Sequence, residues 1–178
     1  MSLKETTVST QTLFEGKVLT LKKDQVRLPD GQLATREYCS HVGAVCIVAL
    51  CDDGTVLLER QYRYAVGEEL IEIPAGKLDF PGEDPLAAAK RELEEETGAR
   101  ADEWIDLGVY YGTPAIMGEK IGMYLARGLQ FGASHRDSDE FLEVFRLPLE
   151  QAVEMIFQQK IPDGKTQAGL LKAWYLTK

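Results

Sequence analysis

The feature that most restricts the fold of this chain is a short helix crowded with glutamates. It lies in the stretch "GKLDFPGEDPLAAAKRELEEETGA", residues 76–99. Asp84 suits the N-cap position, Pro85 the first helical position and Gly98 the position after the last turn. The helical spacing of its apolar residues gives one face to pack on a core, formed by Leu86, Ala89 and Leu93. We therefore expect a helix that starts at Pro85 and ends just before Gly98.

Four glutamates occupy five consecutive positions of this helix, namely Glu92, Glu94, Glu95 and Glu96. Two of them have a basic residue four positions earlier, in the predicted ion pairs Lys90–Glu94 and Arg91–Glu95. Glu92 and Glu96 have no basic partner at that spacing, and like charges four residues apart repel by a few tenths of a kcal/mol. The helix is therefore either a solvated acidic surface or a site for a hard cation such as Mg²⁺, which takes one or two carboxylates and keeps several waters.

The remainder of the chain alternates between strand and helix patterns. About 75 N-terminal residues are mostly strand-like, with a predicted hairpin of 17–28 with 32–41 around Asp30–Gly31, a second of 43–50 with 55–63, and a short strand at 69–76. Beyond the helix, strands are predicted at 104–112, 120–129 and 140–147, and helices at 148–160 and 166–176. The order of elements indicates an α/β fold.

Charge and composition limit the partners. The net charge of −9 argues against a nucleic-acid backbone or an anionic membrane surface, since both are bound by basic patches. The chain has no apolar run near the ~20 residues of a membrane span, and its first ten residues are too polar for a signal peptide. Its three cysteines are odd in number and form no CxxC pair, which is typical of reduced thiols in a cytoplasmic protein.

The spacing within residues 76–99 resembles the signature of the Nudix hydrolases. That signature is Gly, five residues, Glu, seven residues, Arg-Glu, an aliphatic residue, any residue, Glu-Glu, any residue, Gly and an aliphatic residue. The segment "RELEEETGA" fits the second half, and Glu83 is separated from Arg91 by seven residues. Six residues instead of five separate Gly76 from Glu83, so one residue, Phe80 or Pro81, is an insertion in the loop before the helix.

This resemblance implies a Nudix α/β/α sandwich with a mixed sheet, over residues 41–178, preceded by a small antiparallel β region at residues 1–40. It implies that Mg²⁺, with Mn²⁺ as the other possibility, is held by Glu92, Glu95, Glu96 and the carbonyl of Ala75. Arg91 would orient the carboxylates, and Glu95 and Arg91 would take part in catalysis.

Two further features resemble the ADP-ribose pyrophosphatase branch of that family. Pro114 lies fifteen residues after Ala99, as in that branch, and Glu119 in the following loop matches its candidate general base, although the loop begins "TPA" where the branch has "SPG". The simpler interpretations are a strand terminator for Pro114 and an exposed loop charge for Glu119.

The second feature that resembles this branch is the N-terminal region. In the ADP-ribose pyrophosphatase branch this region forms a sheet that joins two subunits and helps to hold adenine. Arg36, Glu37 and Tyr38 are the predicted nucleotide contacts, and Arg63 would bind the diphosphate through its guanidinium. The alternatives are ordinary strand packing for Tyr38 and a surface charge for Arg63. The resemblance thus implies a homodimer.

The predicted activity is metal-dependent hydrolysis of a nucleoside diphosphate sugar, first of all ADP-ribose to AMP and ribose 5-phosphate. The main alternative is a Nudix hydrolase of another substrate, such as a GDP-sugar or a dinucleotide. A nucleotide sensor without catalysis is disfavoured, because the metal glutamates are complete and the chain has no room for a DNA-binding domain.

Overall fold

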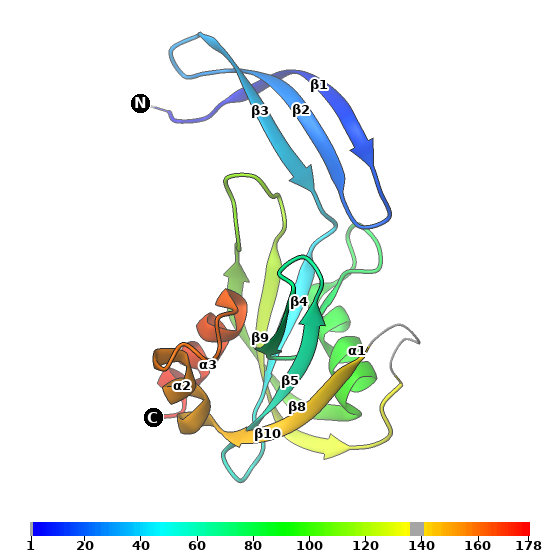
Figure 1. The fold of residues 1–178 in the computed structure, drawn as a ribbon, viewed down its shortest axis with the longest axis vertical. Coiled ribbons are helices and arrows are strands. Elements are labelled where there is room, and N and C mark those ends of the chain that lie inside the picture. Colours follow the sequence, from blue (N-terminus) through cyan, green and yellow to red (C-terminus); the bar gives the residue numbers. More distant parts are fainter. Residues whose placement is uncertain (1, 136–140) are drawn as a thin grey trace. The chain divides into compact units, whose positions relative to one another are not determined.

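The computed structural model describes residues 2–135 and 141–178, and the chain divides into two compact units (Figure 1). The first unit is Met1–Gly43 with Tyr111–Glu119, and the second is Ala44–Tyr110 with Lys120–Lys178. The segment 76–99 that carries the Nudix signature is called the box below. Its glutamate-rich helix and both C-terminal helices belong to the second unit.

The first unit is built on an antiparallel sheet of three strands in the order β1-β2-β3. The strands are β1 (Thr6–Glu15), β2 (Thr20–Arg27) and β3 (Leu33–Ser40). The predicted hairpin around Asp30–Gly31 is confirmed as β2–β3, and Gly31 adopts the positive φ of 90° that favours glycine in such a turn. Strand β1 was missed, because its polar, threonine-rich sequence shows no apolar alternation.

The segment Tyr111–Glu119 joins this unit through the end of β3. The Cys39 N–H donates to the Ile116 carbonyl over 2.8 Å, and the Gly118 N–H donates to the Cys39 carbonyl over 2.9 Å. The loop that carries Pro114 and Glu119 is therefore held by backbone hydrogen bonds to β3.

The second unit contains a mixed sheet and a smaller antiparallel sheet. The mixed sheet has the order β7-β4-β9-β8, in which β4 and β9 are parallel, and the other sheet has the order β10-β5-β6. The strands are β4 (Ala44–Ala49), β5 (Thr55–Arg63), β6 (Glu68–Glu72), β7 (Ala75–Lys77), β8 (Ala99–Tyr110), β9 (Ile121–Phe131) and β10 (Leu142–Pro148).

Helices cover two opposite sides of these strands. Figure 1 shows α1 (Pro85–Thr97) on one side, and α2 (Leu149–Phe157) and α3 (Gly164–Leu176) on the other. Each side has its own apolar core: Ala88, Ala89 and Leu93 of α1 pack with residues of β4, whereas α2 and α3 contribute to a second cluster. The predicted α/β/α sandwich with a mixed sheet is confirmed.

The second predicted hairpin is wrong, although its turn is correct. The Cys51 N–H donates to the Thr55 carbonyl over 2.8 Å, but beyond an isolated bridge between Leu50 and Val56 the two strands enter different sheets. The reason lies in β4, where Val45–Ala49 is completely buried. A continuous apolar run of this kind is typical of a central strand covered on both faces, and β4 pairs with β7 and β9 instead of β5.

The strand predicted at 69–76 is likewise two strands, β6 and β7, in different sheets. Pro74 lies between them and cannot donate a backbone hydrogen bond to a ladder, while its carbonyl accepts from the Ile47 N–H over 2.8 Å. This interruption releases Ala75 and Gly76 to pair with β4, directly before the glutamate-rich helix.

The C-terminal elements follow the predicted order with shifted boundaries. Strand β8 begins at Ala99, earlier than expected, and β10 begins at Leu142; residue 140 of the predicted strand lies outside the described residues. Over 2–135 and 141–178, none of the helices has the length and apolar character needed to cross a membrane.

Candidate active site

Helix α1 is capped as its sequence predicts. The Asp84 carboxylate accepts a hydrogen bond from the Ala87 N–H over 3.2 Å, and Gly98 has a φ of 70° and donates its N–H to the Glu94 carbonyl over 2.8 Å. A Cβ at position 98 would lie 2.5 Å from the Gly132 carbonyl oxygen. Glycine is therefore required there both for its conformation and for the close approach of the backbone that follows β9.

Two of the four box glutamates lie on the buried face of α1. Glu92 is 8% exposed and Glu96 is 4% exposed. The Ala75 N–H donates to Glu96 Oε2 over 3.1 Å, and a Cβ on Gly76 would overlap the carboxylate of Glu92. Both carboxylates therefore meet the backbone of β7, and Gly76 is needed because any side chain would displace Glu92.

Arg91 joins the acidic residues of the box. Its Nη1 donates to Glu92 Oε1 over 2.8 Å and to Glu95 Oε2 over 3.1 Å, and its Nη2 donates to the Lys77 carbonyl over 3.3 Å. Partial burial alone would lower the pKa of Arg91, but the charge and hydrogen bond of Glu92 outweigh it and raise the pKa above its usual value. The predicted Arg91–Glu95 pair is confirmed, and Arg91 remains charged beside the carboxylates.

The predicted Lys90–Glu94 pair is wrong. Glu94 Oε1 accepts from Arg100 Nη2 over 2.5 Å instead, because the turn at Gly98 brings Arg100 back beside the last turn of the helix. This pair lies at the surface, apart from the buried face that carries Glu92 and Glu96.

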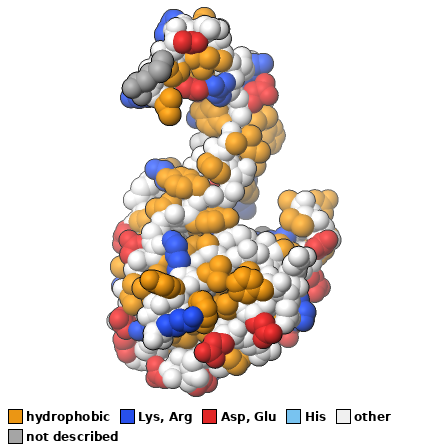
Figure 2. All heavy atoms as spheres, turned by 90° about the vertical axis from the view of Figure 1, so that its left-hand side faces the viewer, with side chains coloured by type: hydrophobic (Ala, Val, Ile, Leu, Met, Phe, Trp, Pro, Cys, Tyr) orange, Lys and Arg blue, Asp and Glu red, His pale blue; other side chains and the backbone are white. Residues whose placement is uncertain are grey.

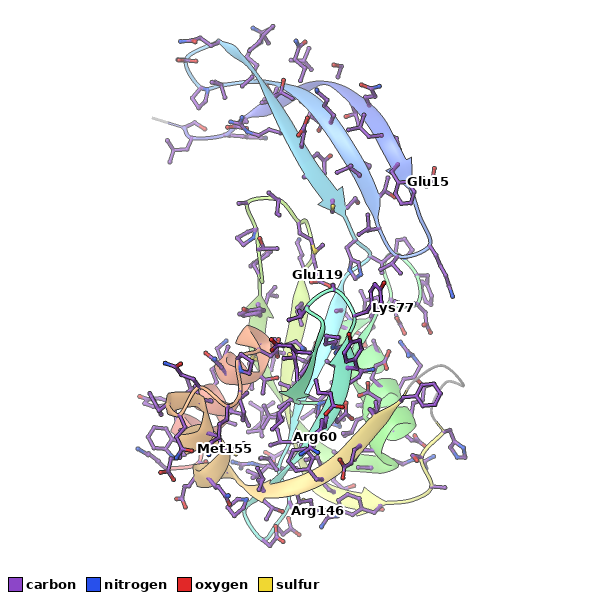
Figure 3. All side chains as sticks on the ribbon, viewed as in Figure 1. Glu15, Arg60, Lys77, Glu119, Arg146 and Met155 are labelled. Carbon is purple, nitrogen blue, oxygen red and sulfur yellow. The ribbon has the colours of Figure 1, made fainter. Side chains whose placement is uncertain are left out.

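Glu83 closes the loop that contains the inserted residue. Its Oε2 accepts from the Asp79 N–H over 2.7 Å, and its Oε1 lies 3.5 Å from Arg91 Nη2. Thus the insertion is accommodated within the loop, and Glu83 still reaches Arg91. Lys77, labelled in Figure 3, marks the end of β7 at which this loop begins.

The donor set of the box suits a hard divalent cation. Glu92 and Glu96 present carboxylate oxygens from neighbouring turns of one helix, next to the backbone of Ala75 and Gly76. The part of the chain that the structure describes holds no group of three or more His, Cys, Asp or Glu side chains arranged for a metal ion. Mg²⁺ does not require one, since one or two carboxylates with waters and substrate phosphates suffice. The ligand roles of Ala75, Glu92, Glu95 and Glu96 stay predictions.

A second charged cluster, which the sequence did not reveal, surrounds Arg63 at the end of β5. Arg63 Nε and Nη2 donate to the two oxygens of Glu72 over 2.7 and 2.8 Å. Lys165 Nζ contacts both Glu72 and Asp163. Arg63 is therefore not a plain surface charge. Asp163 could have been predicted from the sequence as the N-cap of α3, since it lies three residues before Thr166. The contact between Lys165 and Glu72 could not, because it joins residues 93 positions apart.

The three predicted nucleotide contacts of β3 are engaged within the first unit. Their partners are Glu5 for Arg36, Lys23 for Glu37 and Asp24 for Tyr38. The Tyr38 hydroxyl donates to Asp24 over 3.2 Å, and burial, with the nearby charge of Asp24, raises the pKa of Tyr38. The roles of Arg36, Glu37 and Tyr38 in substrate binding stay predictions.

Pro114 and Glu119 belong to the loop that is bound to β3. Pro114 is the second residue of a turn in which the Ile116 and Met117 N–H groups donate to the Thr113 carbonyl. Glu119 Oε1, on the residue labelled in Figure 3, lies 3.2 Å from His41 Nδ1. Glu119 is part of the first unit and the box is part of the second, so its role as a base stays a prediction.

Residues 40–171 match the NUDIX domain family. The chain belongs to the Nudix family. Residues 5–38 match the nucleoside diphosphate sugar hydrolase N-terminal domain. A structure described as an ADP compounds hydrolase superposes with a TM-score of 0.82, covering 99% of this chain and 97% of that one at 23% identity, which shows the shared fold.

Three relatives of this Nudix protein bear on its chemistry. It is 39% identical to a methanol dehydrogenase activator of Bacillus methanolicus, over 91% of this chain and 88% of the relative. It is 38% identical to an ADP-ribose pyrophosphatase of Bacillus subtilis, over 93% and 90%. A GDP-mannose pyrophosphatase of Citrobacter koseri is 37% identical, over 70% and 69%. The protein is a Nudix hydrolase, and members of this family generally need divalent metal ions.

Proposed function

We propose that this protein hydrolyses the diphosphate bond of ADP-ribose, giving AMP and ribose 5-phosphate. The observation that carries the proposal is that the similarity to an ADP-ribose pyrophosphatase extends over 93% of the chain, and that residues 5–38 match the nucleoside diphosphate sugar hydrolase N-terminal domain. The GDP-mannose pyrophosphatase matches only 70%. A GDP-sugar is the second candidate, because that relative retains 37% identity over the shared part.

The residues of the chain divide the proposed reaction between binding and proton transfer. Arg63 binds the diphosphate, Arg91 holds the box carboxylates, and Glu119 removes a proton from the attacking water. Glu92, Glu95, Glu96 and the Ala75 carbonyl would hold Mg²⁺ or Mn²⁺, and the bound ion would supply charge neutralisation of the diphosphate and a lowered pKa of water. We further propose that Arg36, Glu37 and Tyr38 contact the nucleotide and that Pro114 shapes the loop of Glu119. We also propose that the protein is a cytoplasmic homodimer with an N-terminal domain at residues 1–40.

A substrate panel with product identification tests the reaction. We expect ADP-ribose to be hydrolysed with the highest kcat/KM in a set that includes ADP-sugars, GDP-mannose and dinucleotides, with AMP and ribose 5-phosphate as products. Reaction in ¹⁸O-labelled water identifies the phosphorus that water attacks, because only one product then carries the label. Efficient turnover of a GDP-sugar without hydrolysis of ADP-ribose would contradict the proposed substrate.

Glu119→Gln tests the proposed base separately from the substrate. Because a base acts only as the transition state forms, we expect kcat to fall by about a hundredfold while KM and metal affinity change little. Glu103→Gln, at an exposed carboxylate of β8, is the matched control. An unchanged kcat in Glu119→Gln would remove Glu119 from the reaction and leave the substrate assignment intact.

A further inference from the structure

The first turn of α3 takes part in a charged cluster that is largely withdrawn from solvent. It contains two cations, Arg63 and Lys165, and two anions, Glu72 and Asp163. The side chains of Glu72 and Lys165 are 3% and 14% exposed, whereas Arg63 is 39% exposed. Arg63 is thus the most exposed member of the cluster and the one best placed to meet a ligand.

Glu72 is the centre of this cluster. Its two oxygens accept from Arg63 Nε and Nη2, and Lys165 Nζ contacts the same carboxylate while also lying 3.0 Å from Asp163 Oδ2. Burial alone would raise the pKa of Glu72, but the hydrogen bonds from Arg63 and the charges of Lys165 and Arg63 hold it at about 2. Glu72 therefore stays ionised and fixes one edge of the guanidinium, which leaves Nη1 as the nitrogen that Glu72 does not bind.

Lys165 remains a cation in spite of its burial. Burial would lower its pKa, but the charges of Asp163 and Glu72 and the hydrogen bonds to them raise it above the usual value. The hydrogen bonds that Arg63 donates to Glu72 are the largest cause of its raised pKa; burial opposes them, and the charges of Glu72, Asp163 and Glu96 add to the rise.

The same turn of α3 also holds the chain that leads into the box. Asp163 Oδ2 accepts from the N–H and the hydroxyl of Thr166 over 2.9 and 2.6 Å. The Thr166 hydroxyl oxygen in turn accepts from the Ile73 N–H over 3.0 Å, and Thr166 is completely buried. Ile73 lies two residues before Ala75, whose N–H binds Glu96. Lys165 and Thr166 therefore contact two consecutive residues, Glu72 and Ile73, where β6 leads into the β6–β7 connection, and Asp163 holds both Lys165 and Thr166.

We propose that Lys165 and Asp163 are positioning residues for the diphosphate site, holding Glu72 and through it the guanidinium of Arg63. The inference rests on the proposed function, because it takes Arg63 as the ligand of the diphosphate. Neither residue lies in the glutamate-rich box, and Lys165 acts on the substrate only through Glu72 and Arg63.

Stability alone is a weak reason for this arrangement. Removing charges from water costs several kcal/mol per ion, so a buried ion pair often stabilises a fold no better than apolar side chains of the same volume. The cluster instead fixes the orientation of Arg63, because a carboxylate bound through two hydrogen bonds fixes the plane of a guanidinium. A guanidinium that is already oriented loses less freedom when it binds a diphosphate.

A double-mutant cycle on the full-length protein tests the proposal. Lys165→Met is measured alone and in the Arg63→Ala background, with the best substrate of the panel. We expect Lys165→Met to lower kcat/KM about tenfold in the parent, mainly through KM, and less than about twofold when Arg63 is already alanine. Lys165→Arg keeps the charge and should recover part of the loss. Lys172→Met is the matched control. Lys172 lies in the same helix and donates to the Leu107 carbonyl, so its effect on kcat/KM should be the same with and without Arg63.

The outcomes separate this inference from the proposed function. An equal loss from Lys165→Met in both backgrounds would show a general effect on structure and overturn the positioning role. If thermal melting shows that Lys165→Met is not folded, Lys165→Gln, which keeps a hydrogen-bond donor, replaces it in the same cycle. Unchanged kcat/KM in Arg63→Ala, in an enzyme that hydrolyses ADP-ribose, would overturn this inference while the proposed reaction stands. Turnover of a GDP-sugar in place of ADP-ribose would change the proposed substrate and leave the cycle as the test of Lys165.

Discussion

At the scale of single residues, the box combines burial with an excess of negative charge. Glu92 and Glu96 are almost completely buried, and burial disfavours an ionised carboxylate unless other groups compensate. Arg91 contributes one positive charge but lies beside four carboxylates, those of Asp79, Glu83, Glu92 and Glu95. One cation among four carboxylates leaves an excess of negative charge, which favours the binding of a divalent cation.

Glu96→Gln tests this interpretation because it preserves shape and removes one charge. We expect turnover to fall by roughly a hundredfold or more, with Mg²⁺ needed at a higher concentration for half-maximal rate. Glu94→Gln, in the same helix, is the matched control. Because Glu94 pairs with Arg100 at the surface, the activity of this variant should stay within about twofold of the parent. Removing the metal with EDTA should abolish turnover, and added Mg²⁺ should restore it. Near-normal activity in a folded Glu96→Gln protein would rule out Glu96 as a metal ligand.

At the scale of elements, sequence patterns predicted the helix ends and turns that depend on neighbouring residues. The ends of α1 and the β2–β3 turn followed from capping residues and from Asp30–Gly31, since these signals act within a few residues. Sheet membership did not follow, because the choice of partner for β4 depends on burial of both its faces and on β9, far along the chain.

The same distinction explains which parts of the candidate site were predictable. The Arg91–Glu95 pair is a neighbour contact on one helix, whereas the partner of Glu94 depended on how the chain turns at Gly98. The contacts of α3 with β6 join residues 93 positions apart, and two elements must be packed before Lys165 meets Glu72. Family resemblance named Arg63, but only the fold shows what holds it.

At the scale of the whole molecule, the N-terminal sheet has too little core of its own. Only Asp24 and Val26 are buried in its three strands, and all ten residues of β1 are exposed. Figure 2 shows hydrophobic side chains at the surface of this sheet; the exposed large apolar residues include Val8, Leu13, Phe14 and Leu33. A three-stranded sheet generally needs a covered apolar face for stability, and an open edge strand such as β1 is prone to pair with another chain. A second copy of this chain is the partner that would provide both.

The proposed homodimer predicts that a charge on β1 will separate the subunits. Phe14→Glu puts a carboxylate at a 58% exposed position of β1, where an apolar contact between copies would have to bury it at a cost of a few kcal/mol. Light scattering should therefore show a dimer for the parent and a larger monomer fraction for Phe14→Glu, and deletion of residues 2–38 should abolish the dimer and weaken substrate binding. Phe157→Glu, at a 76% exposed position at the end of α2, is the matched control and should remain dimeric. A monomeric parent protein at micromolar concentration would contradict the dimer, and the exposed face of β1–β3 would then require a partner other than a second copy.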